Sequence, residues 1–156
     1  MADWMDELIA RLEAAPWRAT TGLTPEAKAL IDEHLSTLRA ILPEIMKRRG
    51  DGLVDAYSFA VFAGNKAKGD ALMDKLFGAT FRNAGVREPI MWAVLAAYNW
   101  KSNELVGDLP NPWGPVVKLL ELGYPISSDD IVDEDGTEHV DLCVGHKGGI
   151  ETFHIL

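Results

Sequence analysis

Four side chains that could bind zinc lie within 16 residues near the end of the chain: His139, Cys143, His146 and His154. Imidazole and thiolate are ligands that zinc prefers in proteins. If this segment is a strand, His139 and Cys143 project from one face, and His154 could lie on a neighbouring strand. Structural zinc sites usually carry closely spaced pairs of ligands, and only Cys143 and His146 approach that spacing. A small zinc protein, or an enzyme that uses these side chains, is therefore an alternative hypothesis.

The stretch at residues 127–141, SSDDIVDEDGTEHVD, contains seven acidic side chains and no Lys or Arg. An EF-hand calcium loop requires acidic ligands at positions 1, 3 and 5, Gly at position 6 and Glu at position 12. With Gly136 at position 6, Asp133 and Asp135 take positions 3 and 5, but positions 1 and 12 are apolar. The pattern therefore indicates a turn rich in Asp and Gly rather than a calcium loop.

The remaining residues support neither a nucleophile nor a phosphate-binding loop. Cys143 has histidines nearby, but the surrounding carboxylates disfavour the thiolate that a nucleophile requires. Gly64 and Gly69 have the spacing of a P-loop, yet Asp70 stands where that motif requires Lys. We therefore predict a protein that is not an enzyme and that binds no cofactor.

The elements that must position these residues begin with helices. Apolar residues recur at three- and four-residue steps over residues 2–14 and again after Thr24. Thr24 suits an N-cap, Pro25 the first helical position and Gly50 the end of the second helix. Pro43, inside this second stretch, predicts a kink or a division into two helices.

Further helices are expected over residues 66–82, from Pro89 onward and over residues 113–122. The run at residues 57–63 has the composition of a buried strand, but the helical patterns around it favour a helix. Residues 1–125 are thus predicted to form a body of about six helices.

The hydrophobic period changes to two after the last predicted helix. In the run HVDLCV, apolar Val140, Leu142 and Val144 alternate with polar neighbours, and turn residues flank the run. The stretch IETFHIL predicts another strand. Residues 126–156 are therefore expected to form a small antiparallel meander docked on the helices, because an isolated hairpin is marginal in water. The predicted fold class is α+β, in a single domain over residues 1–156.

Charge is distributed unevenly along the chain. Residues 1–102 hold 13 acidic and 13 basic side chains, whereas residues 103–156 hold 11 acidic side chains and only two basic ones. An acidic surface repels nucleic acid and anionic membranes, and it accelerates association with a basic partner. A single Cys, an acidic N-terminal stretch and the lack of a long apolar run predict a cytoplasmic protein.

The segment NPWGPVVKLLELGYP at residues 111–125, followed by acidic strands, resembles the bacterial immunity proteins of polymorphic and contact-dependent toxin systems. The positions that carry the resemblance are Asn111, Pro112, Trp113, Pro115, Leu119, Leu120, Gly123, Tyr124 and Pro125. Gly114 departs from the pattern, in which an acidic or larger residue is expected. The resemblance implies a small cytoplasmic antitoxin that binds a cognate toxin and blocks its active site or substrate path.

Together these observations predict a non-enzymatic immunity protein, a monomer or homodimer, whose acidic C-terminal third masks the active site of a toxin with a basic surface. The residues expected to supply the charge are Asp133, Glu134, Asp135, Glu138 and Asp141. Trp113 and Tyr124 are candidates for aromatic anchors of the interface, the alternative being that both lie in the core. No contact with nucleic acid or membrane is expected.

Overall fold

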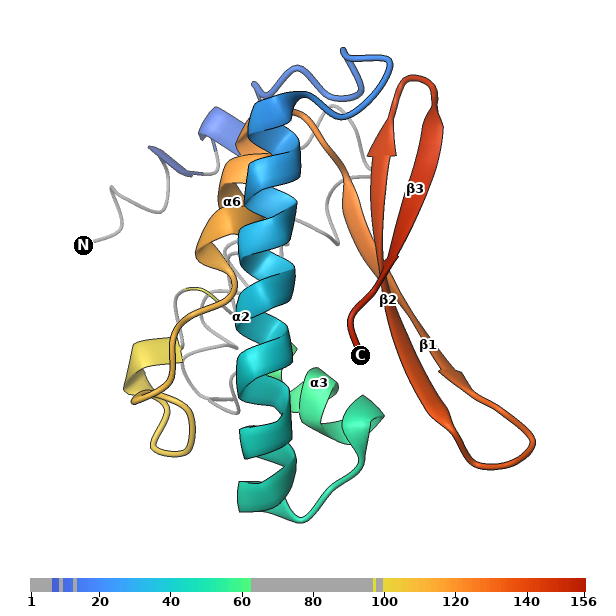
Figure 1. Ribbon diagram of the computed structural model, residues 1–156. Coiled ribbons are helices and arrows are strands. Elements are labelled where there is room, and N and C mark those ends of the chain that lie inside the picture. Colours follow the sequence, from blue (N-terminus) through green and yellow to red (C-terminus); the bar gives the residue numbers. More distant parts are fainter. Residues whose placement is uncertain (1–6, 9, 13, 63–96, 98–99) are drawn as a thin grey trace.

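The computed structural model describes residues 7–8, 10–12, 14–62, 97 and 100–156 (Figure 1). Its helical elements are α2 (Pro25–Arg49), α3 (Leu53–Phe62), the short 3-10 helix η2 (Trp100–Ser102) and α6 (Gly114–Glu121). Its strands are β1 (Ile126–Val132), β2 (Glu138–His146) and β3 (Gly149–His154). Helices thus combine with an antiparallel sheet, and the predicted α+β class is confirmed.

The described part of the chain contains four helical elements, rather than the six or so expected of the whole. The helices predicted over residues 66–82 and from Pro89 onward lie outside the described residues, as does much of that over residues 2–14. The ambiguous run at residues 57–63 is helical as far as Phe62, where the description stops. The preference for a helix over a strand is therefore correct for that run.

α2 is one continuous helix of 25 residues, so the division that Pro43 predicts does not occur. Pro43 lies on the exposed side of the helix, where a carbonyl that loses its N–H partner can turn toward water. The ends are as expected. Thr24 Oγ1 accepts the N–H of Ala27 at 3.2 Å, Pro25 starts the helix, and Gly50 closes it with a φ of 75°.

The sheet has the strand order β1-β2-β3, and both neighbouring pairs are antiparallel. Residues 133–137 join β1 to β2, and the two-residue turn at 147–148 joins β2 to β3. The alternation predicted for β2 is present. Val140, Leu142 and Val144 are buried on the inner face, which packs toward the helices, and the residues between them face outward.

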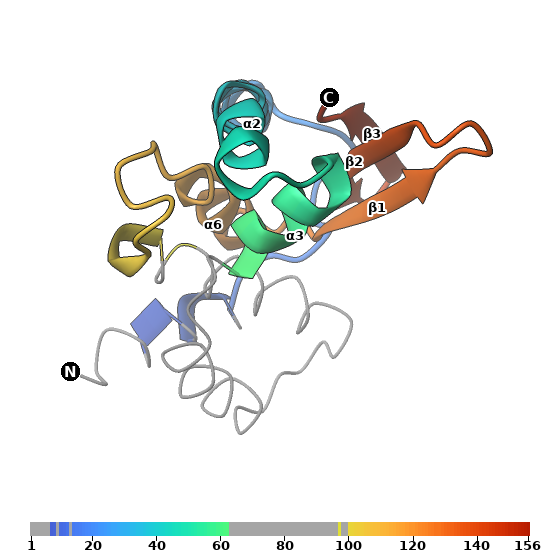
Figure 2. The same cartoon turned by 90° about the horizontal axis from the view of Figure 1, so that it is seen from below.

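The core lies between the sheet and the helices. α3 sits between α2 and the sheet (Figure 2), and α6 runs beside α2. The largest fully buried side chains are Trp100, Leu12, Ile31, Leu38, Leu42, Ile45, Leu119, Leu120 and Leu142. Burial of each aliphatic side chain among them stabilises the fold by about 1.5–3 kcal/mol, and Leu142 brings the sheet into this core.

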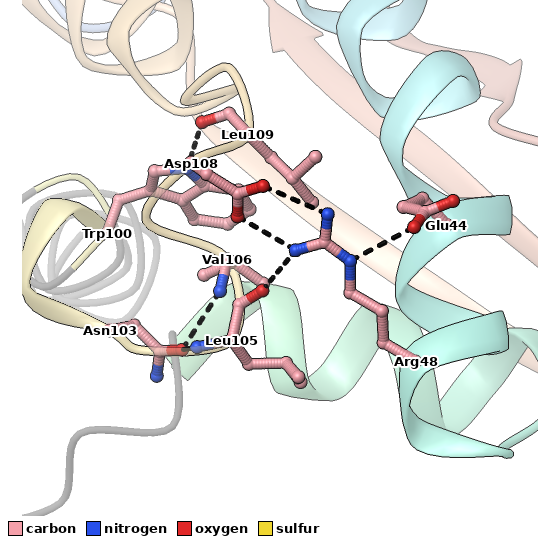
Figure 3. Close-up of polar contacts among 8 residues, drawn as sticks. All are labelled: Glu44, Arg48, Trp100, Asn103, Leu105, Val106, Asp108 and Leu109. Carbon is pink, nitrogen blue, oxygen red and sulfur yellow. Dashed lines mark hydrogen bonds and ion pairs between the residues drawn. The ribbon is translucent and has the colours of Figure 1, made fainter.

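Arg48 joins the last turn of α2 to the loop that precedes α6 (Figure 3). Its guanidinium forms a bidentate ion pair with Asp108, at 2.8 and 3.0 Å, and donates to the carbonyl of Leu105 at 2.6 Å. Glu44, one turn earlier on α2, accepts from Arg48 Nε at 3.1 Å. Asn103 Oδ1 accepts two backbone N–H groups within the same loop. The loop is thereby fixed at the end of α2.

Tyr124 connects the end of α6 to the segment that leads into α2. Its hydroxyl accepts from Thr20 Oγ1 at 2.9 Å and from the N–H of Thr24 at 3.4 Å, and it donates to the carbonyl of Gly22 at 3.3 Å. Thr24 is also the N-cap of α2. One buried hydroxyl therefore holds the start of the longest helix against the segment that leads into the sheet.

Candidate protein-binding surface on the acidic hairpin

We define the acidic hairpin as β1, the turn at residues 133–137 and β2 as far as Asp141. Figures 1 and 2 both show its tip extending beyond the helices, on the side of the molecule away from α6. It contains seven carboxylates and no Lys or Arg. A projection that itself carries charge of one sign suits a role in association with a partner of opposite charge.

The turn at the tip has a defined conformation. The N–H of Asp133 donates to the carbonyl of Thr137 at 2.8 Å, and Gly136 adopts a φ of 86°. Asp135 Oδ1 accepts the N–H of Thr137 at 3.0 Å, and the hydrogen bonds from this residue hold the pKa of Asp135 below its ordinary value. Glu134 is exposed. The tip thus presents carboxylates on a turn that is held by hydrogen bonds.

Two of the predicted charge-bearing residues are paired with histidines. Asp133 Oδ2 lies 2.7 Å from His139 Nε2, and Asp141 Oδ1 lies 2.5 Å from His154 Nδ1. The side chain of Asp141 is only 13% exposed, because it lies at the middle of the sheet's outer face. Asp133 remains available at the tip, whereas Asp141 contributes charge from a recessed position.

Glu138, which was also predicted to supply charge, is half-buried and makes a contact within the protein. Its Oε2 accepts the backbone N–H of Val54 at 2.7 Å, in the first turn of α3. A carboxylate at a helix N-terminus is stabilised by the unpaired N–H groups and by the helix dipole. Gly52 lies so close that a Cβ there would be 2.1 Å from Glu138 Oε1. Glu138 therefore docks the sheet on α3.

Asp129 and Asp130 belong to the candidate surface, although the sequence analysis did not include them. Both are exposed on β1. Burial, followed by the charge of Asp129, raises the pKa of Asp130 above its ordinary value. Period-two alternation places adjacent residues on opposite faces of a strand, so the hairpin carries charge on both faces. The sequence predicted alternation for β2, and the same alternation extended to the preceding strand could have identified Asp129 and Asp130.

Two apolar side chains lie exposed among these carboxylates. Ile131 is 46% exposed and Val132 is 61% exposed, near the end of β1. Ile131 pairs with His139 on the outer face of the sheet, and Val132 pairs with Glu138 at the inner face. A partner that covered the tip would bury these apolar groups, which would add affinity, while the carboxylates would fix its orientation.

Trp113 and Tyr124, the candidate aromatic anchors, are core residues with only 3% and 2% of their surface exposed. Trp113 Nε1 donates to the carbonyl of Ala60 at 3.0 Å, and its ring centroid lies 5.1 Å from that of His34. The hydroxyl of Tyr124 is engaged as described above. The structure therefore favours the alternative, that both residues pack the interior and neither faces a partner.

The four candidate zinc ligands do not converge. His146 points to the inner side of β2, where Nε2 lies 2.9 Å from Glu151 Oε2 and Nδ1 accepts the N–H of Gly148. Cys143 and His139 lie four residues apart on the outer face, or roughly 14 Å along the strand. Among the described residues, no group of three or more His, Cys, Asp or Glu side chains could hold a metal ion.

Cys143 lines a cavity of about 120 Å3 on the outer face, together with residues that include Arg18 and Ile150. Its Sγ lies 3.6 Å from Asp129 Oδ2. Burial raises the pKa of the Cys143 thiol, and the nearby Asp129 carboxylate adds to that shift. The thiol is thus held in its protonated form, which disfavours nucleophilic chemistry.

No family model, curated protein or solved structure matches the chain. Among the described residues, no helix is both long and apolar enough to cross a bilayer.

Proposed function

We propose that this protein is a non-enzymatic, cytoplasmic immunity protein that neutralises a cognate bacterial toxin. The acidic hairpin meets the basic surface around the toxin's active site and masks it. The observation that carries the proposal is the projecting tip, where Asp133, Glu134 and Asp135 stand on an ordered turn beside exposed Ile131 and Val132. Complementary charge accelerates association and fixes orientation, and burial of apolar groups slows dissociation.

The segment at residues 111–125 supports the proposal through resemblance alone. It serves the interior, because the backbone carbonyl of Pro112 accepts a hydrogen bond from His34 and the Trp113 ring packs against that imidazole. The end of the segment leads directly into β1. Its role in the proposed function is therefore to place the sheet so that the hairpin projects.

The test begins with the toxin domain encoded by the adjacent reading frame. Co-expression of the two proteins should restore growth of cells that the toxin domain alone arrests. The purified pair should then associate more slowly as salt rises, because exposed charges are screened. An adjacent frame without a toxin domain, or co-expression without rescue, contradicts the proposal.

Charge reversal at the tip locates the surface. The triple variant Asp133→Lys, Glu134→Lys and Asp135→Lys should lower the association rate at least about tenfold at low salt. The matched control reverses three exposed carboxylates away from the hairpin, namely Asp32, Glu33 and Glu104. Equal effects of the two variants would show that overall charge matters and that the hairpin is not the binding surface.

A further inference from the structure

The hydrogen-bond register of β1 can be followed from both of its ends. Gly145 donates its N–H to the carbonyl of Pro125 at 2.8 Å, and Asp133 donates its N–H to the carbonyl of Thr137 at 2.8 Å. Both pairs continue the register of the strands, which has no bulge. Because hydrogen-bonded pairs alternate in an antiparallel ladder, odd-numbered residues of β1 bond to β2 and even-numbered residues direct their backbone groups away from it.

Ser128, Asp130 and Val132 therefore present their N–H and C=O groups at the outer edge of the sheet. In the part of the chain that the structure describes, no backbone hydrogen bond from another element reaches these three residues. The side chain of Ser128 bonds to Tyr57, but Asp130 and Val132 are exposed. A row of backbone groups in this state is a template for a further strand.

The opposite edge of the sheet is partly covered. Arg39 reaches from α2 to the carbonyls of His154 and Ile155, at 2.7 and 3.0 Å. Ile155 is buried and donates its N–H to Val140, which continues the pairing of this segment with β2 beyond β3. α2 thus engages the end of β3. Among the described residues no element hydrogen-bonds to the backbone at the outer edge of β1, and this strand leads to the projecting tip (Figure 1).

We propose that the β1 edge pairs with an extended segment of the toxin that is rich in Lys or Arg, which becomes a fourth strand of the sheet. This inference rests on the proposed function and specifies how the partner is held. Backbone hydrogen bonds to Ser128, Asp130 and Val132 supply affinity, and alternate side chains of the added strand supply specificity.

Charge identifies the occupant. Asp129 and Asp130 lie at the middle of β1 on opposite faces, so cationic side chains on either face of an added strand would lie beside a carboxylate. Burial and the neighbouring charge of Asp129 raise the pKa of Asp130, so a cationic side chain beside this carboxylate would lower its pKa again. A second copy of the chain is disfavoured, because two β1 edges would bring like charges together.

The full chain can be tested with a short synthetic peptide that alternates Lys and Val, against a matched peptide that alternates Glu and Val. We expect the Lys peptide to slow hydrogen exchange of the Ser128, Asp130 and Val132 amides by at least about tenfold at saturation, because they become hydrogen-bonded. The amides of Asp129 and Ile131 already bond to β2 and serve as internal controls. Protection that is absent, or equal with the Glu peptide, overturns the inference and leaves the carboxylates as guards against self-association.

A variant pair tests the edge in the complex with the toxin domain. Val132→Pro removes an N–H that points away from β2, so the ladder with β2 is retained. Val132→Thr keeps the N–H and is the matched control. We expect Val132→Pro to bind the toxin domain about tenfold more weakly than Val132→Thr, because one hydrogen bond is lost and the ring obstructs the added strand. The peptide measurement uses the unaltered chain and so holds even if Val132→Pro fails to fold.

The two proposals fail differently. If reversal of the tip charges weakens binding while Val132→Pro and Val132→Thr bind equally, the hairpin binds through side chains alone and edge pairing is wrong. If reversal of the tip charges does not change binding of the toxin domain, the tip is not the binding surface and the proposed function is wrong.

Discussion

Glu138 Oε2 accepts the backbone N–H of Val54 at 2.7 Å, so a carboxylate of the sheet caps a helix that lies 84 residues earlier in the chain. This contact joins the base of the acidic hairpin to α3. The base of the hairpin is therefore held against α3 as well as by the pairing of its own strands.

Removal of this cap should destabilise the protein. We expect Glu138→Ala to lower the free energy of unfolding by about 1–2 kcal/mol, because an N-terminal N–H of α3 loses its acceptor. Glu138→Gln should cost less, since its amide oxygen can still accept. Urea unfolding measures both, and Glu134→Ala at the exposed tip is the control, with a change within about 0.5 kcal/mol. A Glu134 variant as destabilised as Glu138→Ala would contradict the assignment.

The neighbouring Gly52 should be coupled to the same contact. A Cβ at this position would be 2.1 Å from Glu138 Oε1, so Gly52→Ala must displace the carboxylate. We expect Gly52→Ala to lose most of the cap in the native background and to have little effect in the Glu138→Ala background. A double-mutant cycle in urea measures this, with Gly22→Ala as control, because no atom lies within 4 Å of a Cβ there. Additive effects would exclude the coupling.

His34 should make stability depend on pH. Burial lowers its pKa to about 4 from an ordinary value of 6.5, although a hydrogen bond to the Pro112 carbonyl partly opposes the shift. The folded state therefore excludes a proton that the unfolded chain binds below pH 6.5. Stability should be fully present above that pH and fall as the pH drops toward 4, by roughly 3 kcal/mol in total.

The measurement for His34 compares variants, because carboxylates also titrate at the lower end of this range. Unfolding by urea at a series of pH values should give a steeper decline for the native chain than for His34→Gln, which cannot acquire a charge. Equal slopes for the native chain and His34→Gln would contradict the prediction.

Arg48 should control the acidity of Asp108. The hydrogen bonds and charge of the guanidinium hold the pKa of Asp108 below its ordinary value (Figure 3). Arg48→Met should therefore raise that pKa toward the value of a free carboxyl, and Arg48→Lys should raise it part of the way, because Lys cannot form the bidentate pair. NMR titration of the carboxyl group measures the shift. An unchanged pKa in Arg48→Met would show that the pair does not persist in solution.

Zinc should not bind in stoichiometric amount. His146 is engaged by Glu151 and by the N–H of Gly148, and His139 and Cys143 are too far apart on their strand to share one ion. Elemental analysis of the purified chain, before and after exposure to zinc and dialysis, checks this. One zinc per chain that is lost in Cys143→Ser would revive the alternative hypothesis of a metalloprotein.

Local patterns predicted the regular elements well. The ends of α2 follow from Thr24, Pro25 and Gly50, because capping depends on residues within one turn of each other. The alternation in β2 likewise predicted its buried face, since strand neighbours always face opposite sides. Such patterns fail at Pro43. A proline usually ends a helix, but α2 continues through Pro43, which lies on its exposed side.

The candidate site was predicted only in part, because the roles of single charged residues depend on contacts distant in sequence. Asp133, Glu134 and Asp135 lie at the tip as the turn pattern implied. Glu138 looked equivalent to them until the structure placed α3 beside it. His146 was grouped with the other candidate zinc ligands, whereas it ends β2 and faces inward, and no local pattern specifies that orientation.

The hydroxyl of Tyr124 has a consequence for how the chain assembles during synthesis. Thr24 can cap α2 as soon as that helix leaves the ribosome, because the bond to Ala27 is local. The segment from Thr20 to Thr24 donates two hydrogen bonds to the Tyr124 hydroxyl, and this residue is synthesised about 100 residues later. The N-terminal part of the protein therefore completes its hydrogen bonds only when the C-terminal third has been made. On a ribosome stalled before Tyr124, the segment that leads into α2 would lack the hydrogen bonds to the Tyr124 hydroxyl.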